Sequence, residues 1–463
     1  MHVPPRSQGS AQTRALRSVF ARRWVLPALE FLHAEVPGGL ILLGAGVLAL
    51  ALANSPLAEG FAHFWETRWE IGVGRLALGG DLRELVNDGL MTLFFFVAGL
   101  EIKREVVEGQ LSSARRAAFP VIAALGGMAV PALLYAVCNG GNGAGSRGWG
   151  VPMATDIAFS IGVLSLLGRR VPASARTFLL ALAIADDIGA IVVIALFYSS
   201  GLHLAPILVA VVFWWAVLAL NVTGVRSLPA HLAAAVGFWL SVRASGIHAT
   251  LAGVILGIST PIRPWFRLGA AAPSVHFLAG KLERAVAAGH SVRAEGLLGQ
   301  IETLARESES LLERKLRGIH PWSSWVVLPL FALANAGVTL SGPAVAQAAR
   351  SPITWGIVLG LVVGKPLGIV GFALLARRTG LAAAPPGLDF RAVVGVGLVA
   401  GIGFTVSLFV AALAFDDPGQ VAAAKVGVLA ASVVAGAFGY GFLWLAPGGS
   451  RPGAGRDGTA ADS

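Results

Sequence analysis

The sequence contains little charge and almost no cysteine, and both shortages restrict what the protein can be. Only 13% of its 463 residues are charged, which is about half of the share in a typical soluble domain. A soluble chain of this length would need a far more polar surface. Cys138 is the single cysteine, so an intramolecular disulfide is excluded and this side chain is interpreted as a small apolar filler. With 56% apolar residues, the composition predicts an all-α polytopic membrane protein.

Apolar runs of membrane-spanning length recur along the whole chain. The first, PGGLILLGAGVLALALANSP, is too long for the core of a signal peptide and is interpreted as a membrane helix. Further runs centre roughly on residues 94, 127, 160, 187, 212, 235, 252, 332, 365, 402 and 433. We therefore expect twelve transmembrane helices in one domain over residues 31–446.

Positive charge is concentrated in alternate loops and not in one binding stripe. Residues 1–30 hold several arginines and no acid before Glu30, and basic clusters recur at 103–116 and 377–391. The formal net charge of +10 is therefore a topology signal and does not indicate nucleic-acid binding. The positive-inside rule predicts two cytoplasmic termini, with a basic tail over residues 1–30 and a disordered tail over residues 447–463.

Two loops differ from simple connections. Residues 61–83 alternate apolar and polar side chains around Gly72 and Gly74, which predicts a small β-hairpin outside the cytoplasm, between the first two helices, as a candidate dimer contact. Residues 259–320 form a long cytoplasmic loop with helical stretches and mixed charges. The simplest interpretation of that loop is solvated helix under the membrane.

Few ionisable side chains fall inside the apolar runs, and three of them are carboxylates. Asp156, Asp186 and Asp187 face a single buried ammonium, that of Lys365. One charge at a bilayer centre costs about 2.5–3.5 kcal/mol even on lenient scales. A single Asp–Lys pair would be explained if it only fixed the register of two helices. Three carboxylates and one ammonium, however, leave two carboxylates without a partner. These two carboxylates must hold protons or a cation. Such an arrangement is expected of a site that exchanges protons for a cation.

The adjacent residues Asp186 and Asp187 cannot both face the same partner. Neighbouring residues on a helix point about 100° apart, so one aspartate of the Asp186–Asp187 pair can meet Lys365 while the other faces a water-filled funnel. Carboxylates, hydroxyls and water suit a hard cation, whereas the Cys and His set of a transition-metal site is missing from these runs.

The fourth and eleventh runs carry signals of broken helices. Thr155 and Asp156 lie in the middle of one run, and Gly401 and Gly403 lie in the middle of the other. Each run is the second of three, in blocks 3–5 and 10–12, which indicates an inverted-repeat transporter. Asp156 would then neutralise the positive ends of the half-helices and Lys365 the negative ends. Close packing of small residues is an alternative reason for the glycines.

Several longer motifs are similar to those of one known family. FFFVAGLEIKREVVEGQLS, ATDIAFSIGVLSLLG, AIADDIGAIVVIALFY, SGIHATLAGVILG and GIGFTVSLFVAALAF follow one another in order, and with them the chain resembles the bacterial NhaA family of sodium/proton antiporters. The resemblance implies twelve transmembrane helices with two inverted three-helix repeats, in which unwound helices 4 and 11 cross. It also implies a homodimer joined partly through a β-hairpin.

The resemblance also assigns roles to the buried charges. Asp187 matches the more direct ligand of the metal cation, and Asp186 matches the aspartate that pairs with the lysine, here Lys365. Thr155 and Asp156 match the Thr-Asp of the unwound fourth helix. These residues are the expected cation- and proton-binding site.

A second group matches the family's pH-responsive residues. Glu101 and Glu105 match acids at the cytoplasmic funnel, and His248 matches a histidine of the eighth helix, although an interhelical hydrogen bond explains a histidine there equally well. The family's acid before the HPW motif is displaced here to Glu313. Among the properties that the resemblance implies, the pH dependence of transport is therefore the one whose residues depart from the family's pattern in this chain.

The resemblance implies electrogenic antiport of cytoplasmic Na+ or Li+ against external protons by alternating access, for sodium and pH homeostasis. The expected place is the bacterial inner membrane, and neither an enzymatic activity nor a cofactor is expected. A sodium-coupled solute transporter of similar design is the nearest alternative. A channel, or an intramembrane aspartyl protease with a GxGD motif in an apolar segment, fits the sequence less well.

Overall fold

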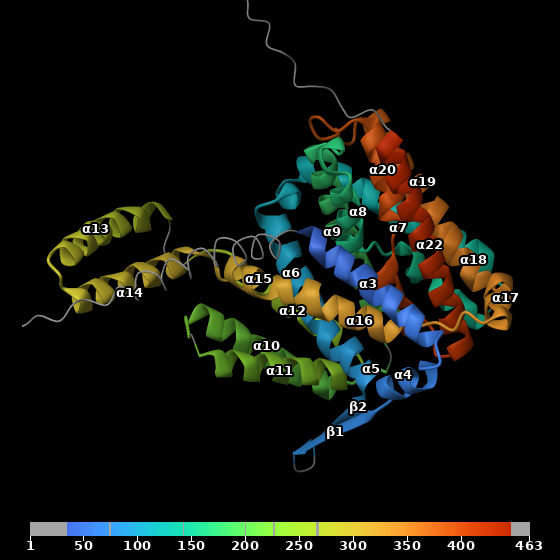
Figure 1. Cartoon of the computed structure of the whole chain (residues 1–463), viewed down its shortest axis with the longest axis horizontal. Coiled ribbons are helices and arrows are strands. Elements are labelled where there is room, and N and C mark those ends of the chain that lie inside the picture. Colours follow the sequence, from blue (N-terminus) through green and yellow to red (C-terminus); the bar gives the residue numbers. More distant parts are fainter. Residues whose placement is uncertain are drawn as a thin grey trace, which may run out of the picture.

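The computed structural model describes residues 35–73, 76–141, 143–199, 201–225, 227–264 and 268–445. These residues form a bundle of helices with one two-stranded hairpin at its edge (Figure 1). The tails expected over residues 1–30 and 447–463 lie outside the described residues.

Within this part of the chain, six helices are long and apolar enough to cross a membrane. Many of their large apolar side chains are exposed, as expected where a bundle is surrounded by lipid. The six are α5–η2–α6 (Leu82–Glu84, Leu85–Leu90 and Met91–Val107), α7 (Ala114–Asn139), α9 (Ala173–Phe197), α10 (Leu204–Val222), α18–η7–α19 (Pro352–Leu359, Gly360–Gly364 and Lys365–Arg378) and α22 (Pro418–Leu445).

Three pairs of helices reach spanning length only together, because each pair is bent at a short break. The pairs, with their angles, are α3 (Glu35–Ala53) and α4 (Ala58–Trp65) at 118°, η4 (Gly143–Met153) and α8 (Ile157–Leu166) at 42°, and α20 (Phe390–Ala400) and α21 (Phe404–Ala414) at 46°. If each pair is one span, the described residues hold up to nine. Twelve spans thus remain a prediction.

The other helices are shorter and complete the bundle. They are η3 (Gln110–Ser112), η5 (Gly168–Arg170), α11 (Leu228–Ala244), α12 (Thr250–Ile258), α15 (Leu311–Trp322), η6 (Ser323–Val327), α16 (Leu328–Asn335) and α17 (Gly342–Arg350). The helices α15, η6 and α16 follow one another directly, so they make one nearly continuous rod (Figure 1).

The hairpin is shorter than the expected range of 61–83. Strands β1 (Arg68–Val73) and β2 (Leu76–Asp81) pair antiparallel, from Arg68 opposite Asp81 to Val73 opposite Leu76. The expected start at residue 61 is wrong, because residues 61–65 complete α4, where Phe61 and Trp65 make an edge-to-face contact one helical turn apart. The chain re-enters helix after Asp81, whose carboxylate accepts a hydrogen bond from the N–H of Glu84 at 2.6 Å.

The long loop expected over residues 259–320 is largely a helical hairpin. Helices α13 (Leu268–Ala287) and α14 (Ser291–Ser308) pack through a small apolar cluster that includes Leu297 and extend away from the bundle (Figure 1). Residues 311–320 of the expected loop belong to α15. That helix is capped by the hydroxyl of Ser310, and Leu312 and Leu316 are buried against α6.

Helices α6 and α12 pack closely against each other, backbone to backbone, at a glycine. A Cβ added at Gly253 would lie 2.1 Å from the backbone oxygen of Thr92, and backbone cannot move aside as a flexible side chain can. Glycine at this position therefore sets the distance between the two helices.

We expect Gly253→Val to lower the free energy of unfolding by about 1–3 kcal/mol, because α6 and α12 must separate to admit the side chain. Thermal unfolding of the purified protein in detergent measures this. Gly44→Val is the matched control, since Gly44 is also helical, is exposed, and has no atom within 4 Å of its added Cβ. Equal shifts in the two variants would contradict the packing argument.

Candidate functional site

The two broken segments, η4–α8 and α20–α21, meet at their breaks. The N–H of Asp156 donates to the carbonyl of Ile402 at 2.7 Å, and the hydroxyl oxygen of Thr155 lies 3.1 Å from the carbonyl oxygen of Ala400. Gly401 lets the break of α20–α21 pack closely against η7, because a Cβ there would lie 2.5 Å from the backbone oxygen of Leu361. Backbone groups that the breaks release from helical bonds are therefore bonded across the two segments.

Asp156 lies at the start of two helices, α8 and α21, the second of which begins directly after Gly403. Its carboxylate accepts hydrogen bonds from the N–H of Phe159 at 2.9 Å, from the N–H of Thr405 at 3.0 Å and from the hydroxyl of Thr405 at 2.5 Å. A negative group is stabilised there, because the positive ends of two helix dipoles meet at it.

Lys365 and Asp186 form a buried ion pair. Lys365 begins α19 and has no exposed surface, and Asp186 on α9 is 2% exposed. The ammonium donates to Asp186 at 2.6 Å and also to the carbonyl of Met153, the last residue of η4. Thr155 donates to the same Asp186 oxygen at 2.7 Å. The other Asp186 oxygen is buried and has no hydrogen-bond partner among the described residues.

Asp187 faces elsewhere, as adjacent helical positions require. It is only half-buried and lines a cavity of about 470 Å³, whereas Asp186 is not among the lining residues. Thr155, Asp156 and Thr405 line the cavity beside Asp187. The cavity therefore ends at the crossing of the broken segments.

The other end of the cavity is lined by charged side chains of α6 and α15, namely Glu101, Arg104, Glu313, Arg317 and His320. Glu101 lies 3.6 Å from His320, and Arg104 lies 3.8 Å from Glu313. The side chains of Arg104 and Glu313 are about 40% exposed. The cavity therefore opens to the surface at this end, which we call the mouth.

Glu105 and His248, expected with Glu101 at the cytoplasmic funnel, do not line the cavity. The Glu105 carboxylate accepts a hydrogen bond from the N–H of Gln110 at 2.6 Å, where α6 ends. His248 lies between α11 and α12, 4.0 Å from Asp88. Because Asp88 and Glu101 are about 20 Å apart along one helix, the expected place of His248 in the funnel is corrected to the opposite end of α6. Its role in pH response stays a prediction.

The sequence motifs do not mark every residue that the structure brings to the site. Thr405 holds Asp156 through two hydrogen bonds, and its signal is only a hydroxyl residue shortly after the glycine break. Glu313, the displaced acid before the HPW motif, and His320 of that motif join Arg104 and Glu101 at the mouth. They lie about 200 positions away in the sequence, and charge patterning on one helix does not predict contacts over that separation.

The donor set at the inner end of the cavity is made of oxygen. In the part of the chain that is described, no three His, Cys, Asp or Glu side chains gather as a resident metal site requires. A cation at Asp187 would take its other ligands from hydroxyls that line the cavity beside it, such as that of Thr155, and from water. Such a mixed set of oxygens suits a hard cation that enters and leaves.

Comparisons with known proteins identify the family of the chain. The profile of the family described as Na+/H+ antiporter 1 matches residues 29–443. The Na+/H+ antiporter NhaA 2 of Sorangium cellulosum (strain So ce56) is 47% identical over 430 residues, which cover 92% of each chain. NhaA 2 of Myxococcus xanthus (strain DK1622) is 46% identical over 93% of this chain and 92% of the relative, and NhaA of Janthinobacterium sp. (strain Marseille) is 43% identical over 95% and 98%. The family expected from the motifs is thus confirmed, and the chain belongs to the Na+/H+ antiporter 1 family.

Proposed function

We propose that the protein exchanges cytoplasmic Na+, or Li+, for external protons at Asp187. The observation that carries the proposal is the place of Asp187, at the inner end of a cavity that reaches the surface and beside the buried Asp186–Lys365 pair. No ion-pair partner of Asp187 is found among the described residues. A half-buried carboxylate in that position is stable when it holds a proton or a cation. Competition between the two ions for one carboxylate couples their movements.

The proposed cycle uses the carboxylates in turn. External protons neutralise the site and release the cation outward, and the neutral site then faces the cytoplasm, loses its protons and takes up the next cation. Asp186 and Lys365 lie at hydrogen-bond distance, so a second proton belongs to the group as a whole and not to one residue. More protons than cations then move per cycle, which makes the transport electrogenic.

We also propose that twelve crossings and two inverted repeats underlie this cycle. The breaks between η4 and α8 and between α20 and α21, with bends of 42° and 46°, support it. Each break lies in the middle member of three consecutive apolar segments, as in transporters built from inverted repeats. Alternating access would then be a movement of the crossing segments and α9 relative to α6 and α15, which line the mouth.

The setting of the protein follows from the same proposal. We place it in the bacterial inner membrane with both termini cytoplasmic and the mouth facing the cytoplasm, where Glu101 and Glu105 would respond to pH. A homodimer through β1 and β2 is proposed because the hairpin extends from the edge of the bundle (Figure 1), and an isolated two-stranded hairpin is only marginally stable.

The test is the luminal pH of everted membrane vesicles that contain the full-length protein and have been acidified by respiration. NaCl, and equally LiCl, should raise the luminal pH, KCl should not, and the response is recorded over a series of external pH values. Sodium-dependent uptake of a solute without release of protons would instead support a sodium-coupled solute transporter and contradict the proposal.

A further inference from the structure

The mouth of the cavity contains two arginines, an unfavourable charge at the entrance of a cation path. Arg104 and Arg317 both line it, and each has a carboxylate partner. Glu313 lies 3.8 Å from Arg104, and Glu309 lies 2.6 Å from Arg317. The two positive charges are therefore compensated in the structure.

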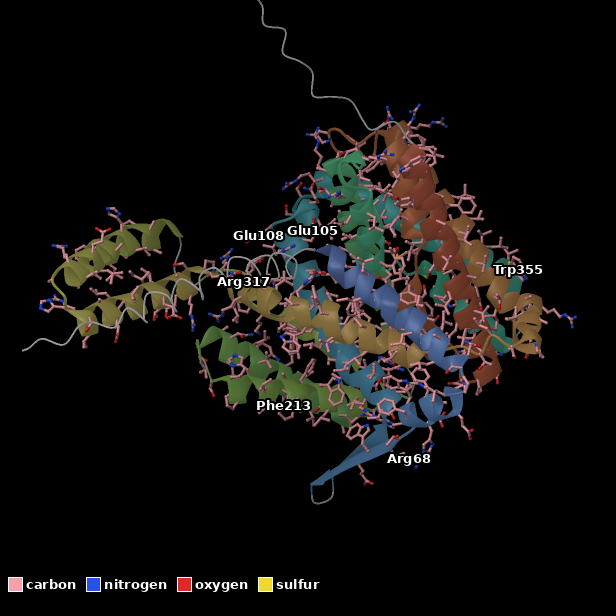
Figure 2. The ribbon with its side chains drawn as sticks, in the orientation of Figure 1. Arg68, Glu105, Glu108, Phe213, Arg317 and Trp355 are labelled. Carbon is pink, nitrogen blue, oxygen red and sulfur yellow. The ribbon has the colours of Figure 1, made fainter. Side chains whose placement is uncertain are left out.

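The two compensating acids have different origins. Glu313 belongs to α15 and lines the cavity itself, whereas Glu309 does not line it and is the first residue after α14. The α13–α14 hairpin thus supplies the counter-charge of Arg317. Figure 2 shows Arg317 where this hairpin joins the bundle, at the same end of the molecule as Glu105 and Glu108.

The backbone around Glu309 is held in place. Ser308 and Ser310 on either side of it are buried, and the hydroxyl of Ser310 accepts a hydrogen bond from the N–H of Glu313 at 3.1 Å. The N–H of Leu312 donates to the carbonyl of Pro261 at 3.2 Å. The Glu309 side chain is 23% exposed, against 67% for Arg317, so the acid is the more buried partner of the pair.

We propose that Glu309 tunes the affinity for the transported cation by neutralising Arg317 at the mouth. This inference rests on the proposed function. Clefts with low-dielectric walls focus the field of their charges, and one sign of charge at the entrance changes the local concentration of ions. Without Glu309, the Arg317 charge repels cations from the cavity, while the carboxylates at its inner end are unchanged. The effect therefore falls on KM and not on the maximal rate.

The experiment measures the KM for sodium from the NaCl-induced pH change in everted vesicles at low ionic strength. We expect Glu309→Gln to raise KM by about two- to tenfold, which is the effect of one unit charge about 12 Å from the cation at an effective dielectric constant between 20 and 80. Arg317→Gln should lower KM, because Glu309 then stands alone, and the double variant should return close to the wild-type value. Choline chloride at about 0.5 M should abolish these differences, since the Debye length is then shorter than about 5 Å.

The matched control is Glu302→Gln. Glu302 pairs with Arg306 at 2.7 Å on α14 of the same hairpin, both side chains are exposed, and neither lines the cavity. Its KM should equal that of the wild type. An unaltered KM in Glu309→Gln would overturn the inference, and so would a rise in both single variants, which would indicate a structural brace. Absence of any sodium-induced pH change in the wild type would overturn the proposed function together with this inference, whereas a normal wild type beside an unaltered Glu309→Gln overturns the inference alone.

Discussion

Vesicles that contain Asp187→Asn should show no sodium-induced change in luminal pH above the level of vesicles without the protein. Asparagine keeps the size of the side chain, but it neither releases a proton nor offers a charged oxygen to a cation. The fold should survive the substitution, because no hydrogen bond or ion pair of Asp187 is found among the described residues. We therefore expect Asp187→Asn to lose ion exchange without a decrease in the stability of the fold.

The control for this variant is Asp389→Asn. Asp389 precedes α20, is exposed and makes no side-chain cap, so its charge can be removed without touching the site. This variant should exchange ions at the wild-type rate. Normal exchange by Asp187→Asn, with a KM for sodium like that of the wild type, would refute the assignment of the site.

Lys365→Met should lower the free energy of unfolding by about 3–5 kcal/mol, the usual cost of removing one partner of a buried ion pair. Methionine fills much of the space of the lysine chain but leaves the Asp186 carboxylate without its ammonium. The carbonyl of Met153 also loses its donor. Thermal unfolding in detergent, compared with the wild type, measures the effect.

A second substitution separates the missing charge from the missing packing. Asp186→Asn combined with Lys365→Met removes both charges, so most of the lost stability should return. Lys103→Met is the control, because Lys103 also donates to a backbone carbonyl, that of Ile258 at 2.7 Å, but at an exposed position. If the double variant were no more stable than Lys365→Met, burial of the unpaired carboxylate would not be the cause.

Some parts of the site could be predicted because they are local properties of the chain. A glycine pair and a Thr-Asp pair in the middle of apolar runs are unfavourable in an uninterrupted helix, and the helices break at Ala400–Phe404 and Met153–Ile157. The angle of about 100° between neighbours also predicts that the two adjacent aspartates have different surroundings.

Other parts depend on packing between distant segments. Residue spacing alone does not say which of Asp186 and Asp187 meets Lys365, because that depends on the rotation of α9 against α19. The place of His248 depends on which end of α6 the turn before α12 reaches, and a histidine in an apolar run carries no such information. The start of the hairpin was equally ambiguous, since Phe61 and Trp65 fit both a strand and the helix in which they pack.

The cavity described above has its mouth on one side, and the residues of α6 that line it begin only at Phe94. Toward His248, Phe409 packs against the rings of Phe95 and Phe331, with centroids 5.3 and 6.2 Å apart. A pore open at both ends conducts ions at a rate set by diffusion. A cavity open at one end releases its bound ions only once for each conformational change. For the proposed exchange, each turnover then requires a change of shape, so at saturating sodium the rate should rise steeply with temperature.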